Sequence, residues 1–152
     1  MRRQLFTAGL ALIVGAGCAL NASAQVKPEV LVDQRIAAMR LQGKYLGPLV
    51  AMAQGKAPYD AAIVARNAGY LDVLIRLAWD GFDPGTQGVK SRALPEVYKE
   101  PAKFKAAQDT MFAETNKFVA AAKSGNEANT KAAINDMLKA CNGCHDDFRQ
   151  RQ

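Results

Sequence analysis

Cysteine and histidine are scarce in this chain of 152 residues, and the shortage restricts the chemistry that it can perform. There are three cysteines, Cys18, Cys141 and Cys144, and a single histidine, His145. A disulfide-stapled scaffold is excluded, because such small folds are dense in cysteine. A second histidine, a paired-carboxylate motif and a phosphate-binding glycine loop are missing too, so the sequence offers no pattern for an enzyme with a substrate pocket.

The rest of the composition is that of an ordinary globular domain. With 22% charged and 49% hydrophobic residues the chain is too apolar for disorder, and 12 glycines are too few for collagen. Its length suits one domain that is large enough to bury its own core. Lysines and arginines are spread along the chain and give a formal charge of +6. This spread predicts a solvated basic surface and no nucleic-acid partner.

Residues 1–24 have the pattern of a secretory signal peptide. Arg2 and Arg3 supply the positive start, residues 5–20 are apolar, and the small tripeptide Ala-Ser-Ala directly precedes Gln25. A signal peptidase requires small residues at this place. We therefore expect cleavage before Gln25 and export from the cytoplasm.

The mature domain is then residues 25–152, with 128 residues and a formal charge of +4. No segment of it approaches about 20 uninterrupted apolar residues, so no membrane span is expected in the mature chain. One alternative is a lipoprotein in which Cys18 is the acylated first residue. It fits less well, because Gly15 stands where a large aliphatic residue is expected.

Helix-start and helix-stop residues divide the mature domain into four helical segments. Proline in the first turn of a helix costs no hydrogen bond, an asparagine or aspartate caps the start, and glycine often follows the end. Residues 81–100 contain five glycines and prolines and are expected to form one long loop. The signals predict helices over residues 28–54, 60–79, 101–124 and 126–149.

Apolar residues within these segments recur in steps of three and four, which is the period of an amphipathic α-helix. Four such helices, joined mostly by short turns, predict an all-α fold, namely an antiparallel four-helix bundle. The apolar face expected for the first helix comprises Val32, Ile36, Met39, Gly43, Leu46, Val50 and Ala53.

Residues 141–145 read Cys-Asn-Gly-Cys-His. Two cysteines three positions apart lie on one side of a helix, and the next residue projects its imidazole close to the same face. This is the spacing of a c-type haem attachment site, in which two thiols add to the vinyl groups of the haem and the histidine binds the iron. The predicted export agrees with it, because haem is attached to such chains outside the cytoplasm.

Other uses of these residues are weighed against haem attachment. Zinc usually needs four ligands, and the mature chain has no further cysteine or histidine to complete a set. A thioredoxin-like pair belongs in a βαβ setting, which this helical pattern does not supply. Two structural thiols in a core would not need the adjoining histidine.

The sequence resembles the class II c-type cytochromes, that is, the cytochrome c′ group with its low-spin relatives. The attachment motif lies within eight residues of the end of the chain and continues as Asp-Asp-Phe-Arg. Residues 55–60 (Gly-Lys-Ala-Pro-Tyr-Asp), residues 79–82 (Trp-Asp-Gly-Phe) and residues 84–86 (Pro-Gly-Thr) are similar to family patterns as well. The resemblance implies a four-helix bundle with one covalently bound haem c in its core, often as a homodimer packed through the first two helices.

The resemblance also assigns roles to residues of the motif. It implies that Cys141 and Cys144 form the thioethers and that His145 is the proximal iron ligand. Arg149 lies one turn later, where the family keeps a basic residue beside that histidine.

Two more arginines are candidates for the haem propionates. Arg35 matches the first-helix arginine that meets a propionate, and its guanidinium can reach from the edge of the core to the carboxylates. Arg92, in the long loop, is a candidate for the second propionate. Either arginine can instead be an ordinary solvated cation.

Met39 matches the family's distal position, where a bulky apolar residue covers the iron or a methionine binds it. Methionine opposite histidine is an electron-transfer pair that raises the reduction potential. Methionine at such a position is also ordinary core filler, and some class II members with methionine here leave the iron five-coordinate. Met52, Met111 and Met137 are expected to be packing residues.

Three functions follow from these observations. The leading hypothesis is a periplasmic monohaem cytochrome that shuttles single electrons between redox proteins, with His145 and Met39 as iron ligands. The second is a protein that binds NO or CO at a five-coordinate iron behind an apolar lid. The third is an exported helical bundle without haem, in which Cys141 and Cys144 form a thiol–disulfide pair.

Overall fold

The computed structural model describes residues 26–151, so the predicted signal peptide and Cys18 lie outside the described residues. The described part is helical and contains no strand, only an isolated antiparallel bridge between Ala93 and Arg149. Within it, no helix has the length and apolar character needed to cross a membrane. Its elements are α1 (Pro28–Ala53), α2 (Ala61–Leu77), the 3₁₀ helices η1 (Trp79–Phe82) and η2 (Pro84–Thr86), α3 (Glu96–Lys99), α4 (Pro101–Ser124) and α5 (Glu127–Phe148).

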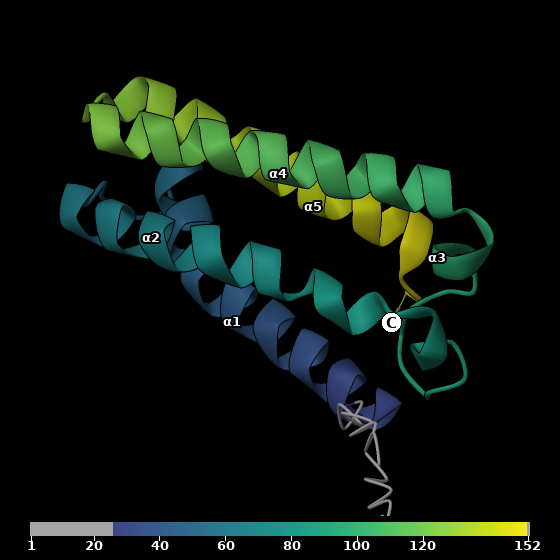
Figure 1. Cartoon of the computed structure of the whole chain (residues 1–152). Helices are drawn as coiled ribbons and strands as arrows, with labels where there is room; N and C mark the ends of the chain where they lie inside the picture. The colour runs from purple at the N-terminus through teal and green to yellow at the C-terminus, as the bar shows by residue number, and fades with distance from the viewer. Residues whose placement is uncertain (1–25, 152) are drawn as a thin grey trace, which may run out of the picture.

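The four long helices form an antiparallel bundle, as predicted (Figure 1). α1 and α2 make one pair, and α4 and α5 make the other. Contacts between α2 and α4 and between α1 and α5 join the two pairs. The turns between α1 and α2 and between α4 and α5 lie at one end of the bundle, whereas the C-terminus lies at the other end.

The ends of the helices follow from the local chemistry of the sequence. Pro28 and Pro101 occupy the first turns of α1 and α4. The carboxylate of Asp60 accepts hydrogen bonds from two backbone N–H groups of α2, and the amide oxygen of Asn126 accepts one from α5. Gly125 ends α4 with a φ of 71°, a left-handed conformation that glycine adopts without strain. These predicted boundaries are confirmed to within about two residues.

The predicted loop over residues 81–100 is more ordered than expected. It contains η2 and the single-turn helix α3, and η1 begins two residues after the end of α2. Pro84 opens η2, and the carboxylate of Asp83 accepts a 2.8 Å hydrogen bond from the backbone N–H of Gly85. Pro84 is the first residue of η2 and Pro95 directly precedes α3, so prolines that break long helices begin short ones here, where a missing N–H costs no helical hydrogen bond.

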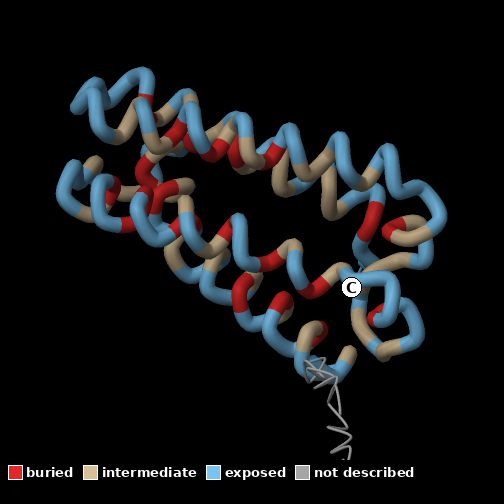
Figure 2. The backbone as a smooth tube through the Cα atoms, in the orientation of Figure 1, coloured by how far each residue is buried: buried red, intermediate tan, exposed pale blue. Residues whose placement is uncertain are grey.

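The apolar core fills one half of the bundle, toward the end that carries the two turns. Buried stretches lie on the inner sides of the helices (Figure 2). Phe118, Leu49, Leu71, Ile134 and Met137 are fully buried there. The cluster also includes Leu46, Met52, Val64, Ala68, Ile75 and Met111.

The buried face of α1 differs from the predicted one. Leu49 and Met52 are buried in place of Val50 and Ala53, and Gly43 is exposed. Leu49 and Met52 belong to the apolar core, where this end of α1 packs against α2 and α5, whereas Val50 and Ala53 lie at its edge and are half-buried. The prediction of core packing for Met52, Met111 and Met137 agrees with their burial.

Gly81 allows η1 to lie directly against α1. A Cβ atom at this position would stand 2.5 Å from Cβ of Arg35 and 2.6 Å from the carbonyl oxygen of Leu31. We therefore expect Gly81→Ala to lower the free energy of unfolding by about 1–3 kcal/mol, because a buried overlap must be relieved by moving a helix. Urea unfolding followed by circular dichroism measures this.

Gly88→Ala is the matched control, because a Cβ atom there has nothing within 4 Å. Its unfolding free energy should stay within about 1 kcal/mol of the parent. Equal stability of both variants would contradict the close packing of η1 on α1.

Candidate cofactor-binding site

The other half of the bundle encloses a cavity of about 800 Å³. Its walls come from α1, the end of α2, η1, the segment after η2, the first half of α4 and the end of α5. This volume lies in the range of about 300–1,000 Å³ that holds small molecules and cofactors. Ile75 and Met111 line the cavity and also belong to the core, so the two halves of the bundle share a wall.

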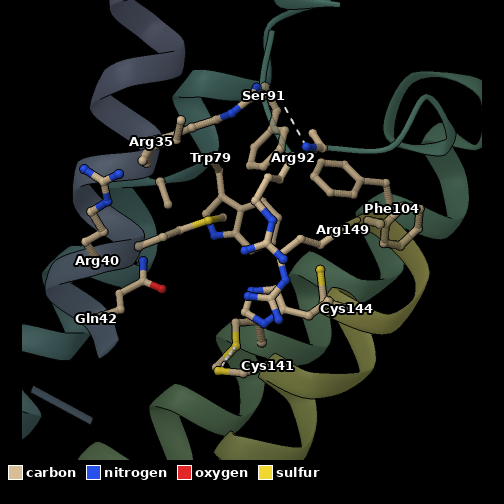
Figure 3. Close-up of a pocket in the computed structure, with 18 of the residues that line it drawn as sticks. Arg35, Arg40, Gln42, Trp79, Ser91, Arg92, Phe104, Cys141, Cys144 and Arg149 are labelled. Carbon is tan, nitrogen blue, oxygen red and sulfur yellow. Dashed lines mark hydrogen bonds between the residues drawn. The ribbon is translucent and has the colours of Figure 1, made fainter. Parts of the chain in front are cut away.

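The two cysteines of the motif reach this cavity from α5. Cys141 and Cys144 line it, and Figure 3 shows both thiols at its wall. The Cys141 thiol lies 3.5 Å from the Met111 sulfur. Burial, followed by the proximity of Cys144, raises the pKa of Cys141 to about 11, and burial also raises the pKa of Cys144. Both sulfurs are therefore protonated thiols at neutral pH.

His145 lines the same cavity from α5 and is half-buried. Burial lowers the pKa of His145, and the positive charges of Arg149 and Arg92 lower it further. The imidazole is therefore neutral at pH 7, which is the form that binds metals.

Met39 lines the cavity from α1. Ile36, three residues earlier, does so as well, and both are half-buried. The structure thus brings the two predicted iron ligands, Met39 and His145, to one cavity from two different helices.

Arg35 is buried more deeply than the sequence predicted. Only 3% of its surface is exposed, and its stem lies against η1. Its guanidinium donates hydrogen bonds to the carbonyl oxygen of Gly81 and, over 2.8 Å, to the hydroxyl of Ser91, and it lies 4.4 Å from the centre of the Phe82 ring. No carboxylate within residues 26–151 pairs with it. Burial of a cation without an ion pair is unfavourable, so an anion in the cavity that Arg35 lines would stabilise it.

Arg92 and Arg149 are brought together by the pairing of the loop with the C-terminal tail. The backbone N–H of Gln150 donates to the carbonyl oxygen of Arg92 over 2.8 Å, and that of Leu94 donates to Phe148 over 2.9 Å. The Arg92 guanidinium donates to the Gln150 carbonyl oxygen. Both arginines are exposed and line the cavity at its solvent side.

An aromatic wall closes the side of the cavity formed by η1, α4 and α5. The ring centres of Trp79 and Phe104 are 5.5 Å apart, and those of Phe104 and Phe148 are 5.1 Å apart, both in edge-to-face geometry. The indole Nε1 of Trp79 is buried and has no hydrogen-bond acceptor within residues 26–151. Sequence reasoning gave no role to this tryptophan, although it is the single one in the chain and lies in a segment that resembles a family pattern.

The residues around the cavity fit a covalently attached haem. Two thiols and a neutral imidazole come from α5, and an aromatic and aliphatic lining would contact the apolar faces of the ring. Within residues 26–151 the buried Arg35 has hydrogen-bond acceptors but no anionic partner, and the Trp79 N–H has no acceptor; haem propionates could supply both. A zinc site is a poorer fit, because no cluster of three or more potential histidine, cysteine or acidic ligands occurs in the described part of the chain.

Comparison with known proteins decides between these possibilities. The family model described as cytochrome c′ matches residues 30–149. The chain belongs to the cytochrome c′ family. Cytochrome c′ of Rubrivivax gelatinosus is 40% identical over 126 residues, which cover 82% of this chain and 98% of the relative. A protein named cytochrome c-556 from Rhodopseudomonas palustris is 32% identical over 148 residues, with 93% and 97% covered.

Solved structures of cytochromes c′ have the same fold. The crystal structure of the Rubrivivax gelatinosus cytochrome c′ matches with a TM-score of 0.79 and 41% identity, covering 82% of this chain and 98% of that one. A ferrous variant of cytochrome c′ from Alcaligenes xylosoxidans with bound NO matches with a TM-score of 0.78 and 34% identity, covering 84% and 99%. The cytochrome c′ family consists of haem proteins that carry electrons or bind gases, not of enzymes, and it carries one covalent haem c. In this chain Cys141 and Cys144 are the attachment pair.

Replacement of both attachment cysteines tests the covalent bond. The full chain, expressed with haem-maturation machinery, should give a red protein whose intact mass exceeds that of the cleaved polypeptide by one haem. Cys141→Ala with Cys144→Ala should abolish this increment, because no thioether can then form. Met137→Ala, a buried change outside the cavity, should keep the increment in whatever protein folds. An intact mass without haem for the parent chain would contradict the assignment.

Proposed function

We propose that this chain is an exported monohaem cytochrome that carries single electrons, and that His145 and Met39 would bind its iron. The observation behind the proposal is that both side chains line one cavity, His145 from α5 and Met39 from α1. The bound haem supplies an iron that cycles between the ferric and ferrous states. Histidine with methionine is a ligand pair used for electron transfer.

The protein side chains would then hold and insulate the group. Arg35 would pair with one propionate, which supplies the negative charge that this buried guanidinium lacks within residues 26–151. Arg92, at the solvent side, would meet the second propionate. Arg149 would lie beside His145, whose pKa is lowered first by burial and then by the Arg149 charge, and the backbone N–H of Arg149 donates to the His145 carbonyl oxygen.

The compartment that we propose is the periplasm. Support comes from the signal pattern of residues 1–24, which lie outside the described residues, and from the attachment motif itself. Its redox partners would then be other periplasmic proteins.

Binding of NO or CO is the second candidate function. A specific observation favours it, since solved structures of the Alcaligenes xylosoxidans cytochrome c′ at 34–35% identity contain NO. In this alternative Met39 would only cover a five-coordinate iron, and neighbours such as Ile36 and Ile75 would keep the pocket apolar. Small neutral diatomic molecules would enter such a pocket more readily than anions.

The haem-free thiol pair is less well supported than either. Redox-active cysteines have a lowered thiol pKa, which makes the reactive thiolate available. Burial instead raises the pKa of Cys141 to about 11 and also raises that of Cys144. These thiols suit addition to a bound haem better than disulfide exchange in solution.

Met39 distinguishes the two haem functions. If its sulfur binds iron, the reduced protein has a low-spin absorption spectrum and takes up CO slowly or not at all. Met39→Ala should then open the sixth position and give a high-spin spectrum with rapid CO binding. Absorption spectra of the reduced protein, with and without CO, measure both properties.

Met111→Leu serves as the control, because Met111 also lines the cavity but no role as ligand is proposed for it. Its spectrum should match the parent. A parent protein that is already high-spin and binds CO at once would contradict methionine ligation and favour the gas-binding function.

We further propose that two copies associate through α1 and α2. The large apolar side chains that are exposed within residues 26–151 all belong to α1, the two residues before it and α2. Tyr70, Val73 and Leu77 are 45%, 57% and 54% exposed and follow one face of α2, and Leu41 of α1 is 40% exposed. Burial of such a face in a dimer removes apolar surface from water.

A charge placed on this face tests the dimer. Val73→Glu should weaken association by at least about tenfold, because it would bury an unpaired carboxylate between the copies. Sedimentation velocity over a range of concentrations measures it, with Ala120→Glu on the exposed face of α4 as the control. A parent chain that stays monomeric at all concentrations would contradict the proposal.

A further inference from the structure

Several exposed positive side chains line the cavity. Arg40 from α1, Lys90 and Arg92 from the segment after η2, and Arg149 after α5 are exposed and line it, and the buried Arg35 lines it too. No aspartate or glutamate is among the lining residues. We call the four exposed residues the cationic rim.

The rim residues form no ion pairs within the described part of the chain. Within residues 26–151, none of the four has a carboxylate within 4 Å, although seven other lysines and arginines of the bundle do. Asp146 and Asp147, the nearest acidic residues in sequence to the attachment motif, pair instead with Arg151 and Lys103. The acidic residues that could neutralise the rim are therefore directed elsewhere.

Haem would neutralise only part of this charge. The proposed function places two propionates in the cavity, and the inference drawn here rests on that function. Two negative groups against the five cations that line the cavity leave three of the positive charges without a partner. The remaining charge lies where the edge of the group would face solvent, because the rim is the exposed part of the lining.

We propose that the cationic rim is the docking surface for a redox protein that presents a patch of carboxylates. Opposite charges on two surfaces steer their encounter and fix the orientation in which they meet. Arg40, Lys90 and Arg149 are the rim residues that no propionate would engage, and the guanidinium groups of the two arginines can bind carboxylates through paired hydrogen bonds. A partner oriented by the rim would lie directly over the cavity mouth, which is the shortest approach to the haem.

The step that docking serves transfers one electron and no atoms. The reduced acidic protein loses one electron, and the ferric iron of this chain gains it and becomes ferrous. No proton or leaving group is involved, so the rim residues act only by attraction and orientation. The reverse transfer, from the ferrous chain to an oxidised partner, uses the same contact.

The test uses the haem-loaded full chain in its ferrous form and two oxidants of opposite charge. Arg40→Glu with Lys90→Glu reverses two rim charges and leaves Arg35, Arg92 and Arg149 in place. Lys56→Glu with Lys123→Glu is the matched control, since both lysines are exposed, lack ion pairs within residues 26–151, and lie at the other end of the bundle. The anionic oxidant is ferricyanide, and the cationic one is tris(phenanthroline)cobalt(III).

Stopped-flow mixing at low ionic strength should show a strong dependence on the rim. Ferricyanide should oxidise the rim variant about tenfold more slowly than the parent, and the difference should shrink as salt is added. The control variant should differ from the parent by less than about twofold, because its charges lie far from the mouth. The cobalt complex should react faster with the rim variant than with the parent.

Polyglutamate represents the carboxylate patch of a protein partner in a second measurement. It should slow the oxidation of the parent and the control variant by ferricyanide but leave the rim variant unaffected. Equal inhibition of all three proteins would overturn the proposal, because total charge and not the rim would then govern binding. A different result would overturn it as well: the rim variant binds phosphatidylglycerol vesicles more weakly than the parent, but polyglutamate inhibits both proteins equally. That result would assign the rim to a lipid surface.

The outcomes separate this inference from the proposed function. A parent chain that contains no haem, or that exchanges electrons with neither oxidant, contradicts the function as an electron carrier. A parent that reacts normally with both oxidants, while the rim and control variants behave alike, leaves the carrier function intact and overturns the docking surface.

Discussion

A buried positive charge organises the functional half of this bundle. Arg35 comes from the first helix, yet its guanidinium bonds to Gly81 in η1 and to Ser91 in the segment that follows η2. The cost of burying this charge without a carboxylate is offset only in part by these hydrogen bonds and by the ring of Phe82. Arg35 therefore fixes η1 and the segment after η2 against α1. It also places a positive charge at the cavity wall, where an anion would be stabilised.

The bundle is divided between stability and function. Its half near the two turns is filled by aliphatic and aromatic side chains, and its other half encloses the cavity. Close packing in the first half holds the four helices at fixed spacing while the second stays open. Ile75 and Met111 stand at the boundary and face both regions, so a cofactor in the cavity would complete the packing that the apolar core begins.

Much of the helical framework can be predicted because its signals are local. Asp60 and Asn126 cap helices through hydrogen bonds within a single turn, and Pro28 begins one where its missing N–H costs no hydrogen bond, so a short segment of sequence contains every group involved. The attachment motif was recognisable for the same reason, since Cys141 and His145 are spaced along one helix. The buried face of α1 was predicted less well, because it depends on how the helix packs against α2 and α5, and α5 lies far along the chain.

The sequence by itself determined the four long helices and the haem attachment motif with His145, because each of these depends on residues within a few turns of one another. Tertiary structure alone decided that Met39 and His145 reach one cavity, that the Trp79 N–H faces no acceptor in the described part of the chain, and that the acids beside the motif pair away from the rim. The physical reason is that burial and electrostatic pairing act through space, between groups whose distance the order of residues along the chain does not specify.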